Sequence, residues 1–297
     1  MKTIGHIGED ALISRLLKLV PTSNPALHTG PGDDCAVVEA SHHEWQLLKT
    51  DAIVENVHFT ADASMRRVGW KAIARVISDI AAMGGRPQWF MVTIGMPPHY
   101  ELEKIEQLYL GMADCLNQYG GVICGGESTR VSAGAGLVIS IAATGLVKKR
   151  HLLQRSTAHQ GDAIYVTGRL GGSLGGRHLD ITPRLREAQW LAAGRFATAM
   201  MDLSDGLAMD LPRLAGASGL GIIIDPARLP CHDNCRSEQA LGDGEDYELL
   251  FTVNPRKTQR LAAQWTEHFP EVPLTCIGTM VAAGEGMMLL GGWDHFC

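Results

Sequence analysis

Apolar residues recur along the chain with two spacings, one typical of helices and one typical of strands. Helical spacing, in which apolar side chains return every three or four positions, predicts helices at residues 8–20, 65–83, 102–119, 184–200, 207–217 and 256–268. Short apolar runs bounded by Gly, Pro or charged residues predict strands at residues 35–38, 46–51, 89–96, 122–124, 137–147, 161–168, 222–224 and 247–253. Paired glycines at 84–85 and 120–121 end two long helices.

The order of these elements favours an α+β fold in both halves of the chain. A doubly wound sheet would require a regular alternation of strand, helix and strand, which the pattern does not show. The length of 297 residues is typical of about two domains. The basic run Lys148-Lys149-Arg150-His151 places the predicted boundary between domains of residues 1–147 and 148–297.

Composition and charge narrow the functional classes. With 45% hydrophobic and 20% charged residues, the chain has the composition of a soluble globular protein. A net charge of -6 offers no basic surface for nucleic acid or an anionic membrane. Charged residues interrupt the first 20 positions, which argues against a signal peptide. The longest uncharged stretch, 131–147, is at the short end for a membrane span. We therefore expect a cytoplasmic protein.

Seven cysteines without framework spacing predict free thiols rather than disulfides. Cys231 and Cys235, with His232 between them, resemble half of a zinc site, but no second pair of suitable spacing follows. Free thiols are therefore the favoured interpretation there as well.

Six short acidic motifs, each at the edge of an apolar run, carry the strongest chemical signal. They are Gly32-Asp33-Asp34, Thr50-Asp51, Ser78-Asp79, Gly125-Gly126-Glu127, Asp202-Leu203-Ser204-Asp205-Gly206 and Gly242-Asp243-Gly244-Glu245-Asp246. Carboxylates are costly to hold near apolar surface without a compensating positive charge, and Mg²⁺ commonly bridges carboxylates to substrate phosphates. Each motif alone is typical of an ordinary turn, but six together favour a nucleotide site with several Mg²⁺ ions.

Other motifs exclude some functions and leave others open. The chain has no P-loop, no nucleophile elbow and no His-Glu-x-x-His helix. The glycine-rich loop at residues 168–176 fits a phosphate cradle and a flexible turn about equally well. Asp79 lies late in a predicted helix, where a negative charge opposes the helix dipole. That position indicates function, with an ion pair to Arg75 as the alternative.

The motifs, taken in order, resemble those of the thiamine-monophosphate kinases, a family of ATP-using enzymes similar to aminoimidazole ribonucleotide synthetase. The resemblance extends from Gly32 to Phe296. Its most specific stretches are residues 50–59, Ser78-Asp79-Ile80-Ala81-Ala82-Met83-Gly84, Leu203-Ser204-Asp205-Gly206-Leu207 and Gly244-Glu245-Asp246-Tyr247-Glu248-Leu249. It implies a two-domain α+β fold, in which the N-terminal domain pairs with its twin in a homodimer.

The resemblance also implies a reaction and a set of site residues. ATP would phosphorylate thiamine monophosphate to thiamine diphosphate, with ADP as the second product. The implied Mg²⁺ ligands are Asp34, Thr50, Asp51, Asp79, Glu127, Asp202 and Asp205. The implied ATP contacts are Gly126, Arg155 and Ser204, and the implied contacts to thiamine monophosphate are His58, Glu245 and Trp293. An aromatic ring such as that of Trp293 suits a cationic substrate.

Phosphoryl transfer requires mainly positioning and charge neutralisation. The acceptor is a phosphate oxygen that is already ionised at neutral pH, so we expect direct transfer without a covalent intermediate or a general base. Several Mg²⁺ ions would relieve the repulsion between the two anions.

Three features depart from the family pattern. Glu127 stands where Asp is usual, and Lys49 stands where a relative often has Ser as a metal contact. Because a protonated lysine side chain cannot bind Mg²⁺, three alternatives stay open at Lys49. One metal position is lost, that position uses only the backbone carbonyl, or Lys49 offsets phosphate charge. The chain is also short between Gly176 and Arg186.

Two alternatives stay open, another ATP-using enzyme of the same superfamily and a non-catalytic nucleotide-binding homologue. A hydrogenase-maturation relative ends in a reactive cysteine after Pro-Arg-Ile, whereas Cys297 follows Asp294-His295-Phe296 here and is interpreted as incidental. Selenophosphate synthetase requires a reactive Cys or selenocysteine near the N-terminus, and no cysteine precedes Cys35.

Overall fold

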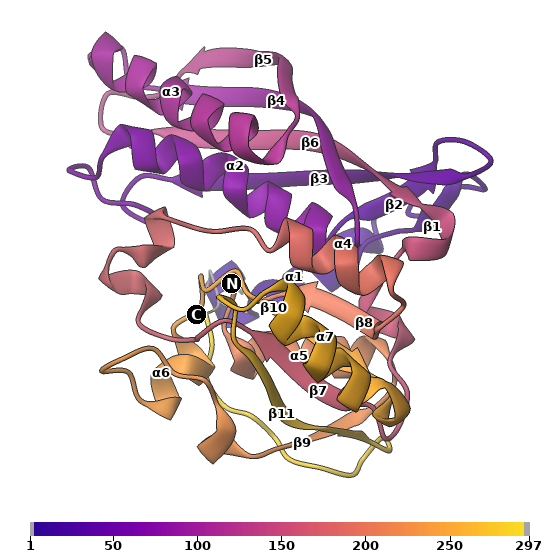
Figure 1. Cartoon of the computed structure of the whole chain (residues 1–297). Coiled ribbons are helices and arrows are strands. Elements are labelled where there is room, and N and C mark those ends of the chain that lie inside the picture. Colours follow the sequence, from indigo (N-terminus) through magenta and orange to yellow (C-terminus); the bar gives the residue numbers. More distant parts are fainter. Residues whose placement is uncertain (1–2, 294–297) are drawn as a thin grey trace.

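Two β-sheets, one from each half of the chain, form the framework of the computed structural model, which describes residues 3–293 (Figure 1). The first sheet has the strand order β1-β2-β3-β6-β4-β5, and its only parallel pair within the described residues is β4–β5. Its strands are β1 (Leu27–Thr29), β2 (Ala36–Glu39), β3 (Glu44–Val54), β4 (Arg86–Met96), β5 (Val122–Arg130) and β6 (Val138–Lys148). The second sheet has the order β8-β10-β7-β11-β9. Its strands are β7 (Ala163–Thr167), β8 (Ala197–Asp202), β9 (Gly221–Ile224), β10 (Leu249–Val253) and β11 (Leu274–Val281).

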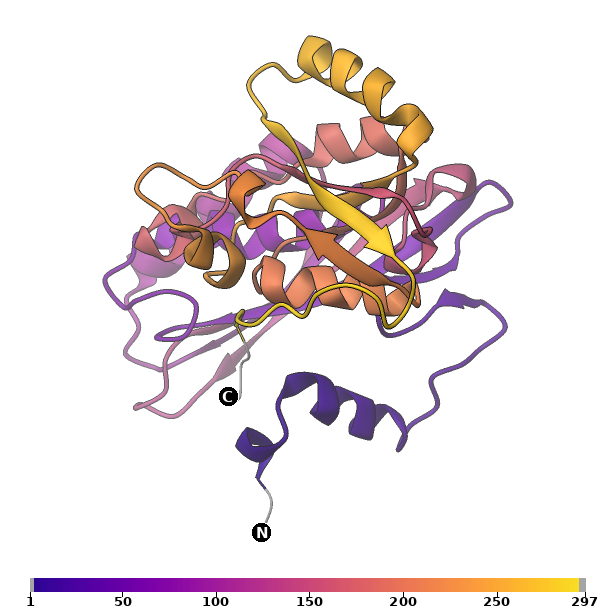
Figure 2. The ribbon, with the colours of Figure 1, turned by 90° about the horizontal axis from the view of Figure 1, so that it is seen from below.

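Helices cover these sheets unevenly. The α-helices are α1 (Glu9–Leu17), α2 (Met65–Ala82), α3 (Leu102–Tyr119), α4 (Leu185–Ala193), α5 (Leu207–Ala217), α6 (Ser237–Gly242) and α7 (Thr258–His268). Short 3₁₀ turns are η1 (Ile4–His6), η2 (Lys149–His151), η3 (Arg155–Thr157), η4 (Ser173–Gly175), η5 (Arg177–Leu179), η6 (Pro226–Arg228) and η7 (Pro255–Lys257). Helix α1 has no buried residue and lies apart from the two sheets (Figure 2). No helix in the described range is long and apolar enough to cross a membrane.

Helix α2 is the central element of the molecule. Fifteen of its 18 residues are buried, because it packs against the first sheet on one side and against α4 and β8 of the second half on the other. A helix that is buried on nearly all sides can carry polar groups only where they find partners. Its crossing with α3 is close at two glycines. A Cβ on Gly69 would lie 1.9 Å from the carbonyl oxygen of Leu108, and one on Gly111 would lie 1.8 Å from that of Arg66.

The second sheet is covered on both faces. Residues of one face, such as Phe251 of β10, belong to a large core shared with α2, α4 and α7. Residues of the other face, such as Leu250, pack with α5 in a smaller core. The sheet thereby fixes the loops at the ends of its strands, including the loop after β8.

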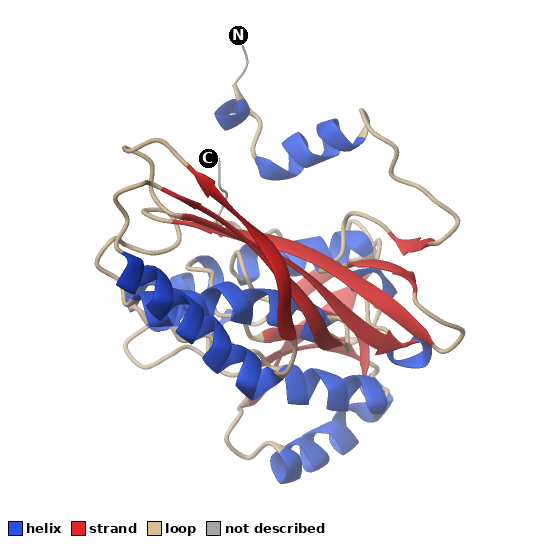
Figure 3. Cartoon of the chain, turned by 90° about the horizontal axis from the view of Figure 1, so that it is seen from above, coloured by secondary structure: helices blue, strands red, loops and turns tan. Residues whose placement is uncertain are grey.

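The first sheet, in contrast, has one uncovered face (Figure 3). Helices α2 and α3 pack on the other face. Leu48, Trp89 and Val122 share a row across β3, β4 and β5 through their pairing with neighbouring strands, and all three are substantially exposed. Met91, two positions along β4, is 47% exposed on the same face. An apolar surface of this kind on a sheet is typical of an interaction site.

The predicted α+β class is confirmed, with three differences in its elements. The helix predicted at residues 184–200 is wrong after Ala193. Arg195 adopts a φ of +53° in a turn, and residues 197–202 pair with β10 as strand β8. Strand β5 does not end before Gly125 but continues to Arg130. The pattern missed β1, β11 and α6. The predicted domain boundary falls at the end of β6 and stays a proposal.

Candidate active site

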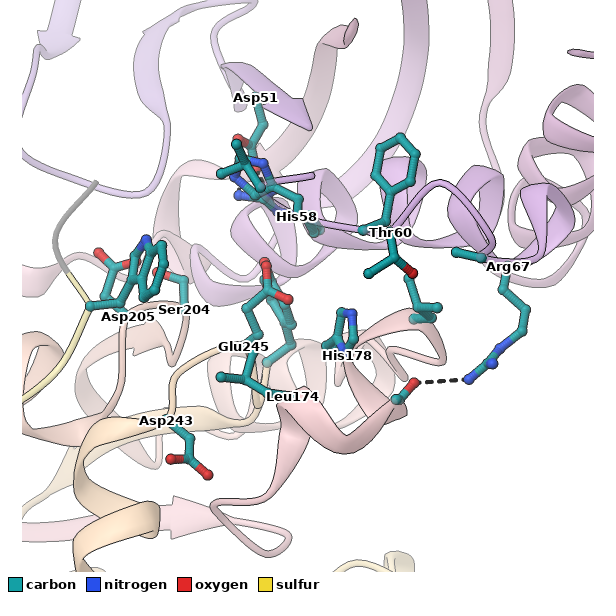
Figure 4. A pocket seen from close by; sticks show the side chains of 18 of the residues that line it. Asp51, His58, Thr60, Arg67, Leu174, His178, Ser204, Asp205, Asp243 and Glu245 are labelled. Atoms are coloured by element: carbon teal, nitrogen blue, oxygen red, sulfur yellow. Dashed lines mark hydrogen bonds and ion pairs between the residues drawn. The ribbon is translucent and has the colours of Figure 1, made fainter. Parts of the chain in front are cut away.

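A cavity of about 820 Å³ opens between the two halves of the chain (Figure 4). The first half contributes β3, the segment after it and helix α2. The second half contributes the loop after β8, residues 174–179 and the segment before β10. Eight residues predicted for the site line it, namely Asp51, His58, Asp79, Asp202, Ser204, Asp205, Glu245 and Trp293.

One face of helix α2 carries polar side chains that line this cavity or bond to residues that line it. Lys71, Arg75, Ser78 and Asp79 follow one another at helical spacing, so they lie on the same side of the helix. All four are buried. A row of buried polar groups on a largely apolar helix indicates that this side of α2 faces the ligand-binding cavity.

Three carboxylates meet at the base of the site. Asp34 precedes β2, Asp79 belongs to α2 and Asp202 ends β8, and ligand oxygens of all three lie within 4.8 Å of one another. The Ser78 hydroxyl donates to Asp202 Oδ2 over 2.5 Å. Burial raises the pKa of Asp79 well above its ordinary value, and burial together with Asp34 raises that of Asp202 to about 6.

This donor set fits a hard divalent cation. Within residues 3–293, the buried Asp34 Oδ2 has no hydrogen-bond partner. A buried carboxylate oxygen without a partner is costly, and burial, followed by the neighbouring carboxylates, disfavours the ionised forms of Asp79 and Asp202. Carboxylate oxygens are also the ligands that Mg²⁺ prefers. A cation bound here would therefore satisfy Asp34 and relieve the repulsion.

Basic side chains form ion pairs with four carboxylates of the site, namely Asp34, Asp51, Asp79 and Asp205. Lys49 Nζ lies 2.6 Å from Asp79 Oδ1, so the ion-pair partner of Asp79 is Lys49 and not Arg75. Arg75 instead lies 3.2 Å from Asp51. The pairs Arg155–Asp34 and Arg213–Asp205 complete the set.

Arg155, predicted as an ATP contact, thus lies beside the acidic cluster and donates to Asp34. Burial would lower the pKa of Arg155, but Asp34 and Asp33 raise it above its usual range. Burial likewise opposes the charge on Lys49, and Asp79 and Asp51 raise its pKa despite that burial. Both side chains therefore stay cationic inside the site.

Five of the predicted site residues do not line the cavity themselves, namely Asp34, Thr50, Gly126, Glu127 and Arg155. Asp34 and Arg155 adjoin it, because Asp34 shares the acidic cluster with Asp79 and Asp202 and Arg155 pairs with Asp34. Thr50 points away from it. In β3, the side chains at positions 49 and 51 face α2, so that of Thr50 points to the uncovered face of the sheet.

Gly126 and Glu127 lie on β5, three strands away from β3 in the sheet order. Glu127 is aligned through Thr93 and Ser140 with Ala52, at a distance of roughly 14 Å by the usual strand spacing. One chain therefore does not bring Glu127 to the acidic cluster.

Glu245 is held in place at the cavity by a buried lysine. Lys71 Nζ lies 2.5 Å from Glu245 Oε2 and 2.8 Å from the backbone carbonyl of His58. Burial lowers the pKa of Lys71 to about 8. Glu245 has a φ of +53°, in the left-handed region that non-glycine residues rarely adopt. Strain of this kind is typical of functional sites, and the sequence pattern gave no sign that Lys71 would belong to this one.

The glycine-rich loop behaves as a structural turn. Its amides are occupied by the chain itself, since Gly171 N–H donates to Asp246 and Gly172 N–H donates to Asp243. The turn interpretation is therefore favoured over a phosphate cradle. The loop leads to His178, which lines the cavity and which no sequence signal identified. Its Nδ1 lies 3.1 Å from the carbonyl oxygen of Ser173, and burial lowers the pKa of this imidazole.

The six cysteines in the described range are free thiols. The half-site at residues 231–235 does not form a metal centre. Within residues 3–293, three potential metal ligands come together at the Asp34 cluster and not at residues 231–235. Cys297 lies outside the described residues.

Comparisons with known proteins identify the family and the fold of the chain. Two family models match the chain, the N-terminal domain of AIR synthase related proteins over residues 32–147 and the C-terminal domain over residues 134–289. The thiamine-monophosphate kinase of Escherichia coli (strain K12) is 34% identical over 328 residues, which cover 97% of this chain and 98% of that protein. These matches confirm the expected two-domain fold, similar to that of aminoimidazole ribonucleotide synthetase.

Two solved structures are similar over nearly the whole chain. AaThiL complexed with AMPPCP and TMP has a TM-score of 0.85 at 28% sequence identity, with 99% of both chains covered. The thiamine-monophosphate kinase of Stenotrophomonas maltophilia K279a has a TM-score of 0.75 at 28% identity, with 93% of this chain and 94% of that chain covered.

Proposed function

The chain belongs to the thiamine-monophosphate kinase family, and from this premise we propose that it phosphorylates thiamine monophosphate with ATP. The products are thiamine diphosphate and ADP, and the reaction serves thiamine diphosphate biosynthesis. The observation that carries the proposal is the cluster of Asp34, Asp79 and Asp202 at a cavity that Glu245 and Trp293 also line. The similarity to AaThiL, which was solved with AMPPCP and TMP, supports the same pair of ligands.

The acidic cluster suits the triphosphate. Asp34, Asp79 and Asp202 would hold Mg²⁺, with Asp51 and Asp205 at the rim. Bound there, Mg²⁺ would neutralise phosphate charge and favour an in-line arrangement of the attacking and leaving oxygens. Ser78 fixes the orientation of Asp202 through its hydroxyl, and Arg155 beside Asp34 adds a fixed positive charge toward the phosphates.

Glu245 and Trp293, which also line the cavity, suit the acceptor. Lys71 holds Glu245 in one position, and the Trp293 amide donates to the carbonyl oxygen of Asp205. A carboxylate and an aromatic ring would thus face the positively charged ring system of thiamine monophosphate. The acceptor phosphate is already ionised, so we assign no general base. The proposed reaction is direct transfer, and a phosphorylated protein intermediate would contradict it.

A second copy of the chain explains the placement of Glu127. Gly126 and Glu127 lie on the exposed edge strand β5, next to the uncovered apolar face of the first sheet. We propose that two copies pair through this face and that Gly126, Glu127 and Thr50 act at the interface. The free thiols support a reducing compartment, and we propose the cytoplasm.

The test is a coupled measurement on the purified protein with ATP and Mg²⁺. We expect ADP release that depends on thiamine monophosphate and equals thiamine diphosphate formation one for one. Asp34→Asn keeps the side-chain shape but removes a charge, and we expect it to lower turnover at least about 100-fold, as loss of a strong electrostatic contact does. The matched control is Asp114→Asn, an exposed carboxylate paired with Arg66 outside the cavity, which should keep turnover.

Two results would overturn the proposal. One is ADP release that does not require thiamine monophosphate, which would indicate another acceptor. The other is ATP binding without turnover, which would favour a non-catalytic nucleotide-binding protein.

A further inference from the structure

Lys49 places its ammonium group within the acidic cluster, 2.6 Å from Asp79 Oδ1. Building on the proposed kinase function, we propose that the Lys49 ammonium group replaces one divalent cation, so that this chain binds one ion fewer than the same site would bind with a neutral residue at position 49. The proposal concerns the number of metal ions per chain, a property that is measured independently of turnover.

The geometry directs Lys49 to the cluster. In β3 its side chain points toward α2, on the same side as Asp51. The Lys49 Nζ atom donates to Asp79 Oδ1 over 2.6 Å, and the Lys49 and Asp79 side chains are 23% and 10% exposed. An ammonium group is a compact point charge with three donors, which makes it a closer substitute for a small ion than a planar guanidinium is.

The balance of charge at the cluster depends on this residue. Asp33 lies 4.0 Å from Arg155, so it shares that partner with Asp34. Asp33, Asp34, Asp79 and Asp202 carry four negative charges when ionised, and within the described residues their ion-pair partners are Arg155 and Lys49. This group is left with two negative charges, which one divalent cation neutralises. Without Lys49 three negative charges are left, which one divalent cation does not neutralise, and Asp79 has no ion-pair partner. Buried carboxylates in that state are strongly unfavourable, and a further divalent cation would relieve them.

The other basic residues nearby are less able to play this part. Arg75 is engaged with Asp51 and with the carbonyl oxygen of Ala52, and Arg155 is engaged with Asp34. Lys71 is committed to Glu245. Lys49 alone among these four reaches Asp79, whose remaining partners in the cluster are carboxylates.

The test counts bound Mn²⁺ by electron paramagnetic resonance of the free ion, at saturating AMPPCP. We expect Lys49→Ser to bind one Mn²⁺ more per chain than the wild-type protein. Lys49→Arg keeps the charge and should keep the wild-type count, and Lys49→Gln serves as a second neutral variant if the serine variant unfolds.

The matched control is Lys149→Ser. Lys149 forms an ion pair of similar length, 2.8 Å, with Glu39 outside the cavity, so its loss should leave the Mn²⁺ count unchanged. Equal counts in folded Lys49→Ser, folded Lys49→Gln and wild-type protein would overturn the proposal, because they would mean that metal displaces Lys49 instead of being replaced by it. That result would leave the kinase function intact if the wild-type protein forms thiamine diphosphate. Failure of the wild-type protein to do so would overturn the function whatever the count.

Discussion

The buried carboxylates of this protein have two different roles, one at the cavity and one in a structural turn. Those of the Asp34 cluster lie against a cavity and fit a cation. Asp246, by contrast, accepts hydrogen bonds from the Gly171 amide and stabilises the glycine-rich loop. Burial raises the pKa of Asp246 to about 7, with the Gly171 amide and then Arg177 opposing the shift. The two kinds of carboxylate should therefore respond differently to pH and to substitution.

The Asp246 carboxyl should make stability depend on pH. Its folded-state pKa of about 7 exceeds the ordinary value of about 3.9 in an unfolded chain. The folded state therefore holds the proton more tightly, and this stabilisation is present at low pH and lost as pH rises through about 7. Because each pKa unit corresponds to about 1.4 kcal/mol, wild-type protein should lose at least about 1 kcal/mol more than Asp246→Asn between pH 5 and pH 8.

Urea unfolding at both pH values measures this difference. Asp233→Asn is the control, since Asp233 is an exposed carboxylate paired with Arg169, and its pH dependence should match that of the wild-type protein. Parallel losses in the wild-type protein and Asp246→Asn would contradict the assignment.

Sequence reasoning identified residues with a distinctive chemical type and missed those that act through position. The acidic motifs predicted Asp34, Asp79 and Asp202 correctly as neighbours, because carboxylates beside apolar runs are unusual. Lys71 and His178 carry no such signal. Their roles depend on which side of a helix or loop meets the cavity, and tertiary packing decides that.

At the scale of elements, the position of α2 determines the site. This helix carries Arg75, Ser78 and Asp79, and its distance from α3 is set by the glycines at their crossing. A side chain at Gly69 would clash with backbone, which cannot move aside as a flexible side chain could. The site is therefore sensitive to a substitution that touches no ligand.

We predict that Gly69→Ala destabilises the protein by about 3 kcal/mol, the upper range for overpacking, and weakens Mn²⁺ binding because α2 shifts. Gly216→Ala is the control. Gly216 lies in α5, and a Cβ added there would meet no atom within 4 Å, so alanine should be neutral or stabilise by about 0.5–1 kcal/mol through helix propensity. Chemical unfolding and Mn²⁺ titration measure both effects. Equal stability of the two variants would contradict this prediction, because it would mean that α2 and α3 can move apart without a loss of folding free energy.

Element prediction succeeded where one period was sustained over many residues, as in α2 and α3. It failed at residues 194–200 because a short apolar run fits a helix and a strand alike, and the pairing of β8 with β10 decided the outcome. Strand β11 was missed for a related reason. Its residues include Gly278 and several polar positions, and its conformation depends on pairing with β7 and β9.

At the scale of the whole molecule, the cavity and the uncovered sheet face lie on opposite sides of the first sheet. The first sheet supplies Asp51 to the cavity from the face that α2 covers, while Thr50 and Glu127 occupy the face that no helix among residues 3–293 covers. Sequence alone could propose that these residues share a function, but not that they lie on opposite sides of a sheet. A second copy on the uncovered face would reconcile the motif with the geometry.

The pairing predicts a specific change in assembly. Met91 lies on β4 among the exposed apolar residues of the uncovered face and is 47% exposed, so Met91→Lys would place a charge in an apolar interface, which is strongly unfavourable for association. We expect the wild-type protein to sediment as a dimer and Met91→Lys to sediment as a monomer. If Glu127 acts across the interface, turnover should fall together with association.

Leu110→Lys is the matched control, because Leu110 is 45% exposed on α3, on the other side of the sheet. It should keep both the dimer and the activity. A Met91→Lys protein that stays dimeric would remove this face as the interface. A wild-type protein that is monomeric and fully active would show that the mechanism does not need a second copy. Glu127 would then have no part in the site, because in a single chain it lies three strand spacings, about 14 Å, from β3.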